Sequence, residues 1–176
     1  MSIETETTVA SRLCSACGIC CNGVMFRMVT LQRRDAASVL SAHGLKLKRR
    51  KGQQFFEQPC SKFCGSHCSI YEDRPERCQV FECRQLKRVA AKEITEAAAM
   101  ETILETKRRV AEMERLLNLL GDANLKRPLS KRFEKVTAEP LDETSDPDLV
   151  QRRTDLVEAE RKLSQMLDEE FRVSGD

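Results

Sequence analysis

Nine cysteines, all between Cys14 and Cys83, are the feature that most constrains how this chain of 176 residues can fold. Four of them fall within eight positions, in the segment CSACGICC at 14–21. Thiols packed this closely form disulfides, bind a metal ion or hold an iron–sulfur cluster. The chain has no Trp, one Tyr and seven Phe, so its aromatic core is thin. A short region with a small core usually needs cross-links of one of these kinds.

The sequence favours metal binding over disulfides because nothing in it indicates export. The first residues, MSIETETTVASR, include acidic side chains and no apolar run, unlike a signal peptide. No segment approaches the roughly 20 apolar residues of a membrane span. We therefore predict a cytoplasmic protein without a membrane partner, in which thiols stay reduced and clustered cysteines more often bind metal. An odd number of cysteines also fits disulfide pairing poorly.

Basic residues predominate in the first half of the chain. Residues 1–88 hold 15 Lys and Arg against 8 Asp and Glu, whereas residues 89–176 hold 15 against 20. The basic run KLKRRK is followed by a turn signal, Lys51-Gly52, and by QQFF. This pattern predicts a β-hairpin over 45–57 with solvated charges on one face. No nucleic-acid-binding motif accompanies the run, so we do not expect nucleic acid as a partner.

A short helix is expected before this hairpin. Thr30 is placed to cap a helix over residues 31–43, and Gly44 is placed to end it. Its apolar residues recur at rough helical spacing, which predicts a modest buried stripe.

A second helix is expected after the hairpin, around the last two cysteines. Asp73 and Glu76 have the spacing of a capping box, and Pro75 is tolerated in the first turn. Cys78 and Cys83 would point about 140° apart on an undistorted helix, since five residues advance about 500°. Either the helix breaks between them, or they serve different sites.

The cysteine-free tail is predicted to be mostly helical. Residues 84–120 contain no Gly or Pro, and Gly121 is placed to end a long helix there. The stretch 122–147 carries three prolines and reads as an irregular linker, and a second helix is expected over 147–171. Apolar residues recur every seven positions in both helices: Ile103, Val110 and Leu117, then Leu149, Leu156 and Leu163. This repeat places the apolar residues in a stripe along each helix, which indicates an antiparallel helical hairpin or an oligomeric coiled coil.

The predicted fold class is therefore a small α+β, cysteine-rich, metal-stabilised domain followed by a mostly α-helical tail. We place the metal-binding domain at 12–88 and the tail at 89–176, with the linker at about 122–147. Cys-x-x-Cys steps suit tetrahedral zinc and iron–sulfur clusters alike, and Gly18 eases the turn between them. The adjacent Cys20 and Cys21 would point to opposite sides of an extended backbone and so supply two centres, or one thiol would bridge two metals. Eight cysteines fill two four-ligand sites, or one cluster and one zinc site.

The order of these motifs resembles a known family. CSACGICC, Pro59-Cys60, the segment CSIYEDRPERC at 68–78 and the segment FEC at 81–83 are similar to the YkgJ-like cysteine-cluster family, whose CxxCxxCC signature is linked to zinc or iron chelation. The resemblance covers about residues 12–88 and implies eight metal ligands: Cys14, Cys17, Cys20, Cys21, Cys60, Cys68, Cys78 and Cys83.

The remaining polar residues near the cysteines receive separate expectations. Cys64 lies outside the family pattern and is either a free thiol near the site or a substituting ligand. His67 is expected to be an exposed loop residue rather than a ligand, and His43 is a weaker candidate still. Tyr71 is expected to cover the site, while Arg74 offsets thiolate charge by hydrogen bonding. Pro75 is expected to set the turn.

These observations predict an intracellular zinc- or iron–sulfur-binding module whose helical tail holds a protein partner or a second copy of the chain. One alternative is an iron–sulfur or metal-dependent enzyme that modifies a protein and uses Cys64 as a reactive thiol. Another is a labile metal carrier or sensor. A purely thiolate coordination sphere admits both zinc and iron–sulfur clusters. The sequence shows no HExxH or P-loop motif, and its two histidines offer no readable Ser-His-Asp set.

Overall fold

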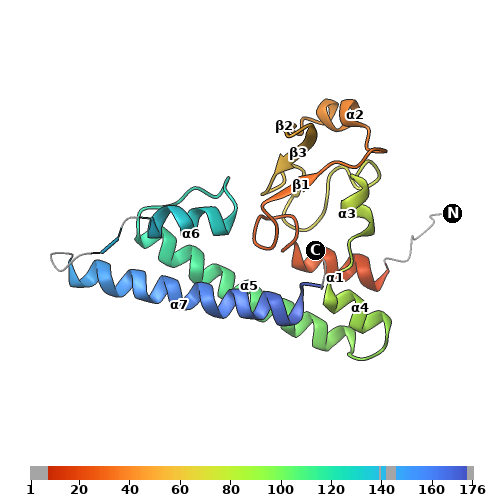
Figure 1. Cartoon of the computed structure of the whole chain (residues 1–176). Helices are drawn as coiled ribbons and strands as arrows, with labels where there is room; N and C mark the ends of the chain where they lie inside the picture. The colour runs from red at the N-terminus through yellow and green to blue at the C-terminus, as the bar shows by residue number, and fades with distance from the viewer. Residues whose placement is uncertain (1–7, 139, 142–145, 174–176) are drawn as a thin grey trace.

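The computed structural model describes residues 8–138, 140–141 and 146–173. It is an α+β structure in which a small sheet and the cysteines come first and two long helices follow (Figure 1). The predicted fold class is confirmed. None of the helices in these ranges is both long and apolar enough to cross a membrane.

The sheet has three short antiparallel strands in the order β1-β3-β2. Strands β2 (Lys48–Arg50) and β3 (Gln53–Glu57) form the predicted hairpin, with Lys48 opposite Phe55. Lys51 and Gly52 both have positive φ, 48° and 81°, as a two-residue type I′ hairpin turn requires. Strand β1 (Met28–Thr30), which we did not predict, pairs with β3 on the other side. The hairpin prediction is confirmed.

Helix α2 (Ala37–Ala42) is shorter than the predicted helix over 31–43. Thr30 does not cap it, because Thr30 belongs to β1. The intervening chain turns where the Gln32 N–H donates to the Asp35 carboxylate, at 2.6 Å. The predicted end at Gly44 is confirmed, since its φ is +84°.

The helix predicted around the last two cysteines is broken into two. Helix α3 (Glu76–Val80) carries Cys78, and α4 (Arg84–Ala90) begins directly after Cys83. The first of the two alternatives left open by the sequence is therefore correct.

The predicted capping box at the start of α3 is wrong. The N–H of Glu76 donates to the Asp35 carboxylate at 2.8 Å, so the cap comes from a residue 41 positions earlier. The Asp73 carboxylate instead lies 2.7 Å from the His43 ring. His43 is thus a hydrogen-bond partner of Asp73.

The single helix predicted over 84–120 is also wrong. The chain leaves α4 through Lys92, whose φ is +59°, and restarts as α5 (Glu96–Leu119), where the Thr95 hydroxyl accepts from the Ala98 N–H at 3.1 Å. The linker contains a further helix, α6 (Leu129–Thr137), so it is not simply irregular. The buried Arg132 of α6 pairs with Asp122 at 3.0 Å and so fixes α6 against the end of α5.

Helix α7 (Pro147–Glu170) runs antiparallel to α5, and the two lie side by side (Figure 1). Five of the six predicted heptad residues are buried there in one core: Ile103, Val110, Leu117, Leu156 and Leu163. The prediction is wrong for the sixth, Leu149, which is 40% exposed near the start of α7. The Thr106 hydroxyl also lies 3.4 Å from the Met166 sulfur. The stripes therefore form a helical hairpin within one chain, as one of our two alternatives predicted.

This larger core also includes residues from the cysteine-rich segment. Leu13 of α1 (Val9–Cys17) and Ile19, each 1% exposed, belong to the same buried cluster as the α5 and α7 residues. The Lys107 ammonium of α5 donates to the carbonyl of Ala16 at 3.0 Å. The boundary between residues 88 and 89 stays a prediction, and buried packing runs across it.

Candidate metal centre

The eight predicted ligands come from five separate stretches of chain. The last turns of α1 carry Cys14 and Cys17, and the turn after it carries Cys20 and Cys21. The others lie in the segment after β3, in α3 and at the start of α4: Cys60, Cys68, Cys78 and Cys83. All nine cysteines lie in described segments and carry free thiols.

Gly18 makes the approach of the first four thiols possible. It ends α1 with φ +67°, in the left-handed region that favours glycine. A Cβ at this position would lie 2.3 Å from Cζ of Phe63, so the backbone packs directly against that ring. The Gly18 carbonyl then accepts from the N–H groups of Cys21 and Asn22, both at 2.9 Å.

Cys20 and Cys21 therefore lie in a tight turn, and our expectation of extended backbone is wrong. Their sulfurs are 3.7 Å apart. This contact raises the pKa of Cys20 and lowers that of Cys21, chiefly because one thiol donates a hydrogen bond to the other. The turn brings both thiols to one place instead of separating them.

The segment from Cys60 to Cys68 closes over this turn. The Cys60 N–H donates to the Cys21 carbonyl at 2.8 Å, which ties the two cysteine clusters together. Phe63 and Cys68 form an isolated antiparallel bridge. Cys64 lies at the exposed tip, where its N–H donates to the carbonyl of His67 at 2.9 Å. His67 is exposed, as expected.

Burial raises the pKa of most of these thiols. It is the largest cause for Cys17 and Cys78, whose pKa values rise to about 12. Although solvent reaches Cys14, the atoms packed around its thiol raise its pKa to about 11. Burial is also the largest cause of the raised pKa of the other three: Cys60, Cys68 and Cys83. The folded chain thus holds thiols that only a cation would readily convert to thiolates.

Backbone N–H groups prepare several sulfurs for a negative charge. At four positions the backbone N–H two residues later lowers the pKa of the thiol: that of Ile19 for Cys17, Lys62 for Cys60, Ile70 for Cys68 and Gln85 for Cys83. Hydrogen bonds of this kind stabilise a charged sulfur over a neutral one. The four-fold repetition makes the surroundings suited to metal-bound thiolates.

Arg74 acts on the thiols through its charge, which lowers the pKa of four of them: Cys14, Cys21, Cys68 and Cys78. Its Nε donates a hydrogen bond to the Tyr71 carbonyl, at 2.9 Å, and hydrogen bonding of Arg74 to a thiol stays a prediction. The guanidinium lies over the half-exposed Tyr71 ring at 3.6 Å from the centroid, and cover of the metal site by Tyr71 also stays a prediction. Pro75 immediately precedes α3, where it was expected to set the turn.

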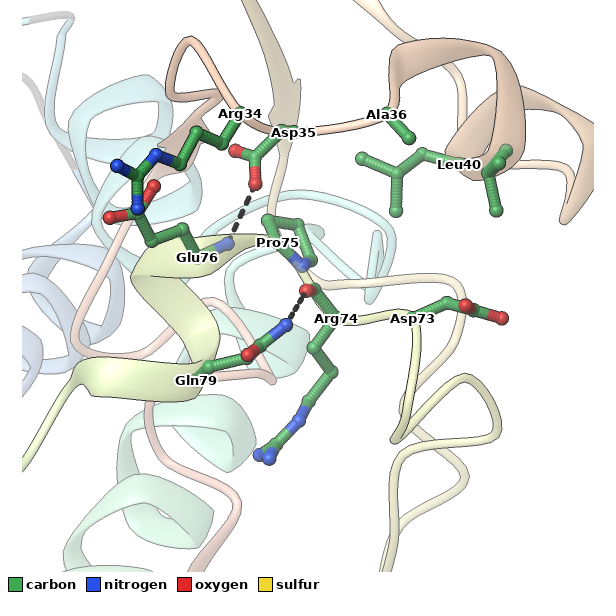
Figure 2. Close-up of a pocket in the computed structure, with 10 residues that line it drawn as sticks. Arg34, Asp35, Ala36, Leu40, Asp73, Arg74, Pro75, Glu76 and Gln79 are labelled. Carbon is green, nitrogen blue, oxygen red and sulfur yellow. Dashed lines mark hydrogen bonds between the residues drawn. The ribbon is translucent and has the colours of Figure 1, made fainter.

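A separate hollow of about 410 Å³ lies between α2 and α3 (Figure 2). The hydrogen bonds from Glu76 to Asp35 and from Gln79 to the Arg74 carbonyl are drawn along its floor (Figure 2). No cysteine is among the described residues that line it. The hollow is therefore not the metal site.

The sequence missed two contributors to the thiol cluster. The Phe63 ring packs on Gly18, and Lys107 of α5 lies close enough for its charge to lower the pKa of Cys17. Both contacts join segments far apart in the chain, so no local sequence pattern could predict them.

The thiols gather without closing a coordination sphere. In the ranges that the structure describes, no three Cys, His, Asp or Glu side chains already stand together as a metal site. The donors nevertheless fit zinc or iron, because soft thiolates suit these metals and backbone donors and Arg74 compensate the charge. The class defined by this fold and these donors is a cysteine-cluster metal-binding protein.

Comparison with protein families agrees. Residues 13–112, more than half of the chain, match the CxxCxxCC family model, described as a "putative zinc- or iron-chelating domain". The chain belongs to this family, and the resemblance inferred from its cysteine motifs is confirmed. The match extends past residue 88 into α5, which packs on α1. Comparisons with curated proteins and with solved structures gave no match.

Proposed function

We propose that this protein is an intracellular module that holds zinc or iron firmly through its family cysteines, with the metal forming part of the folded structure. The observation that carries the proposal is the gathering of family cysteines from separate stretches of chain: the sulfurs of Cys20 and Cys21 lie 3.7 Å apart, and the Cys60 N–H donates to the Cys21 carbonyl at 2.8 Å. Backbone N–H groups also lower the pKa of Cys17, Cys60 and Cys68, which favours the charged sulfur that a bound cation requires.

A retained metal fits this site better than a labile one. Most of the thiols are partly buried and come from five stretches that must all be in place. Release of the metal would leave those stretches without their common partner, so release and unfolding are coupled. A carrier instead requires ligands that exchange without loss of structure.

The test is anaerobic purification of the full chain, followed by elemental analysis and an absorption spectrum. We expect zinc or iron bound through sulfur, and the spectrum distinguishes colourless zinc from an iron–sulfur chromophore. A high-affinity chelator should remove the metal slowly and with loss of helical signal. Protein that contains neither metal, or that gives up its metal rapidly while fully folded, would contradict the proposal.

The tail has a proposed second role as an interaction surface. Five of its six predicted heptad residues are buried between α5 and α7, so a protein partner or second copy would use the outer faces. Leu104 of α5 and Leu149 and Val157 of α7 are exposed there. Analytical ultracentrifugation of the full chain and of a Leu149→Ser/Val157→Ser variant tests self-association through this surface.

A further inference from the structure

We infer that the eight family cysteines form two separate four-thiolate centres that meet at the adjacent residues Cys20 and Cys21. The first centre uses Cys14, Cys17, Cys20 and Cys83, and the second uses Cys21, Cys60, Cys68 and Cys78. The inference rests on the proposed metal-binding function and specifies how that function divides the ligands.

The two sets pack against different hydrophobic cores. Cys17, Cys20 and Cys83 contact the larger core, which is built from α1, α5, α6 and α7. The other core is smaller and lies around the sheet and α2, with Val29, Leu40, Leu45, Phe56 and Ile70 buried in it. The cysteines that contact this smaller core are Cys60, Cys68 and Cys78. Each set therefore belongs to its own packed unit.

The backbone of the first set is held by helices. Cys14 and Cys17 are three positions apart on α1, so their side chains lie on one face, one turn apart. Cys83 occupies the N-cap position of α4, with extended backbone at the start of that helix. Both α1 and α4 pack against α5, which brings the two ends of this set together.

The backbone of the second set is held by hydrogen bonds between its members' segments. The Cys21 carbonyl accepts from the Cys60 N–H at 2.8 Å. The Ser69 N–H donates to the Lys62 carbonyl at 2.8 Å, which closes the loop that brings Cys68 back toward Cys60. Cys78 enters from α3, which contacts β1 of the sheet.

The adjacent thiols of Cys20 and Cys21 could bind the same metal ion or two different ones. The 3.7 Å between the sulfurs of Cys20 and Cys21 is close to the edge of a zinc–thiolate tetrahedron, about 3.8 Å for bonds of about 2.3 Å. One metal could therefore take both. Because Cys83 packs on the larger core with Cys17 and Cys20, that choice would leave sets of five and three thiols. Separating the pair gives each metal four sulfurs.

The experiment loads the full chain, stripped of its own metal under anaerobic conditions, with ¹¹³Cd²⁺ alone. Proton–cadmium correlation spectra then show which cysteine β-protons couple to which ion. We expect two cadmium resonances, each coupled to four cysteines in the sets named above. An ion coupled to both Cys20 and Cys21, or to members of both sets in any other combination, overturns the division. Failure to bind cadmium at all would refute the proposed metal-binding function and the division with it.

Single substitutions give an independent readout. Cys83→Ser should weaken or remove only the first resonance, and Cys78→Ser only the second, each lowering cadmium content by about one ion per chain. Cys64→Ser is the matched control, an exposed cysteine outside both sets, and should keep both resonances. Loss of both resonances in either ligand variant would indicate one interdependent cluster and count against two centres, with the coupling pattern of the unsubstituted chain deciding the assignment.

Discussion

Replacing Leu13 with Ala should destabilise the helical tail, although Leu13 lies in the cysteine-rich segment. Its side chain is 1% exposed and belongs to the core formed by α5 and α7. A fully buried Leu→Ala change costs about 2–5 kcal/mol, because it removes apolar contact and leaves a cavity. Val9→Ala is the matched control: it lies on the same helix and is 36% exposed, so its cost should stay within about 0.5 kcal/mol.

The assay is guanidinium unfolding of the metal-loaded protein, followed by circular dichroism at 222 nm. Helices α5 and α7, with 24 residues each, dominate this signal, so the perturbation and the readout lie in different segments. We expect the helical signal of Leu13→Ala to be lost at clearly lower denaturant concentration than that of Val9→Ala. If the two variants lost it together, the cysteine-rich segment and the tail would fold independently, and the reasoning from a shared core would be refuted.

Three further predictions concern the thiol cluster. Gly18→Ala should lower the melting temperature more than Gly65→Ala: both positions have positive φ, at a cost of about 1–2 kcal/mol, but only the first adds a clash with Phe63. Equal melting temperatures would argue against close packing there. Arg74→Gln should weaken zinc affinity by about tenfold in a competition titration, or about 1.4 kcal/mol, whereas Arg77→Gln, whose charge affects none of the resolved thiol pKa values, should not. Finally, burial raises the pKa of most of these thiols, so they are protonated near neutral pH. Zinc binding should therefore release protons, and zinc affinity should rise with pH. A titration in weak buffer with a pH indicator measures the proton release. Binding without proton release would mean that the thiols are not the ligands.

Local signals in the sequence predicted the elements that depend on local physics. The hairpin over 45–57 follows from two residues, Lys51 and Gly52, that adopt positive φ between alternating strands. Helix α7 begins at Pro147, a residue suited to the first turn, and its buried stripe follows the heptad repeat. The family resemblance likewise comes from motifs that can be read within short segments, such as CSACGICC and CSIYEDRPERC, and the family match confirms it.

Features that depend on distant contacts could not be predicted in this way. Asp35 caps α3 from 41 residues away, and a nearer acidic residue, Asp73, fits the local capping rule equally well. Lys92 interrupts the long helix with φ +59° and no glycine to mark the break. The three residues of β1 form a strand only because β3 offers them a partner. Extended backbone at Cys20 and Cys21 was a default that the Gly18 turn overrides.

The two proposed centres adjoin hydrophobic cores of different size, and this difference affects what a metal would do at each centre. The first is backed by the larger core, whose α5–α7 packing buries a full heptad stripe without any thiol. The second adjoins five buried apolar residues and a sheet whose strands are three to five residues long. A sheet so small has little stability of its own, whereas a structural metal contributes on the order of 10 kcal/mol to folding. A metal in the second centre would therefore organise the sheet region, whereas a metal in the first would fix α1 and α4 on a helical framework that already has a core. Because Cys20 and Cys21 are adjacent, the backbone that positions one ion would also position the other, and the two regions would be joined where their ligands meet.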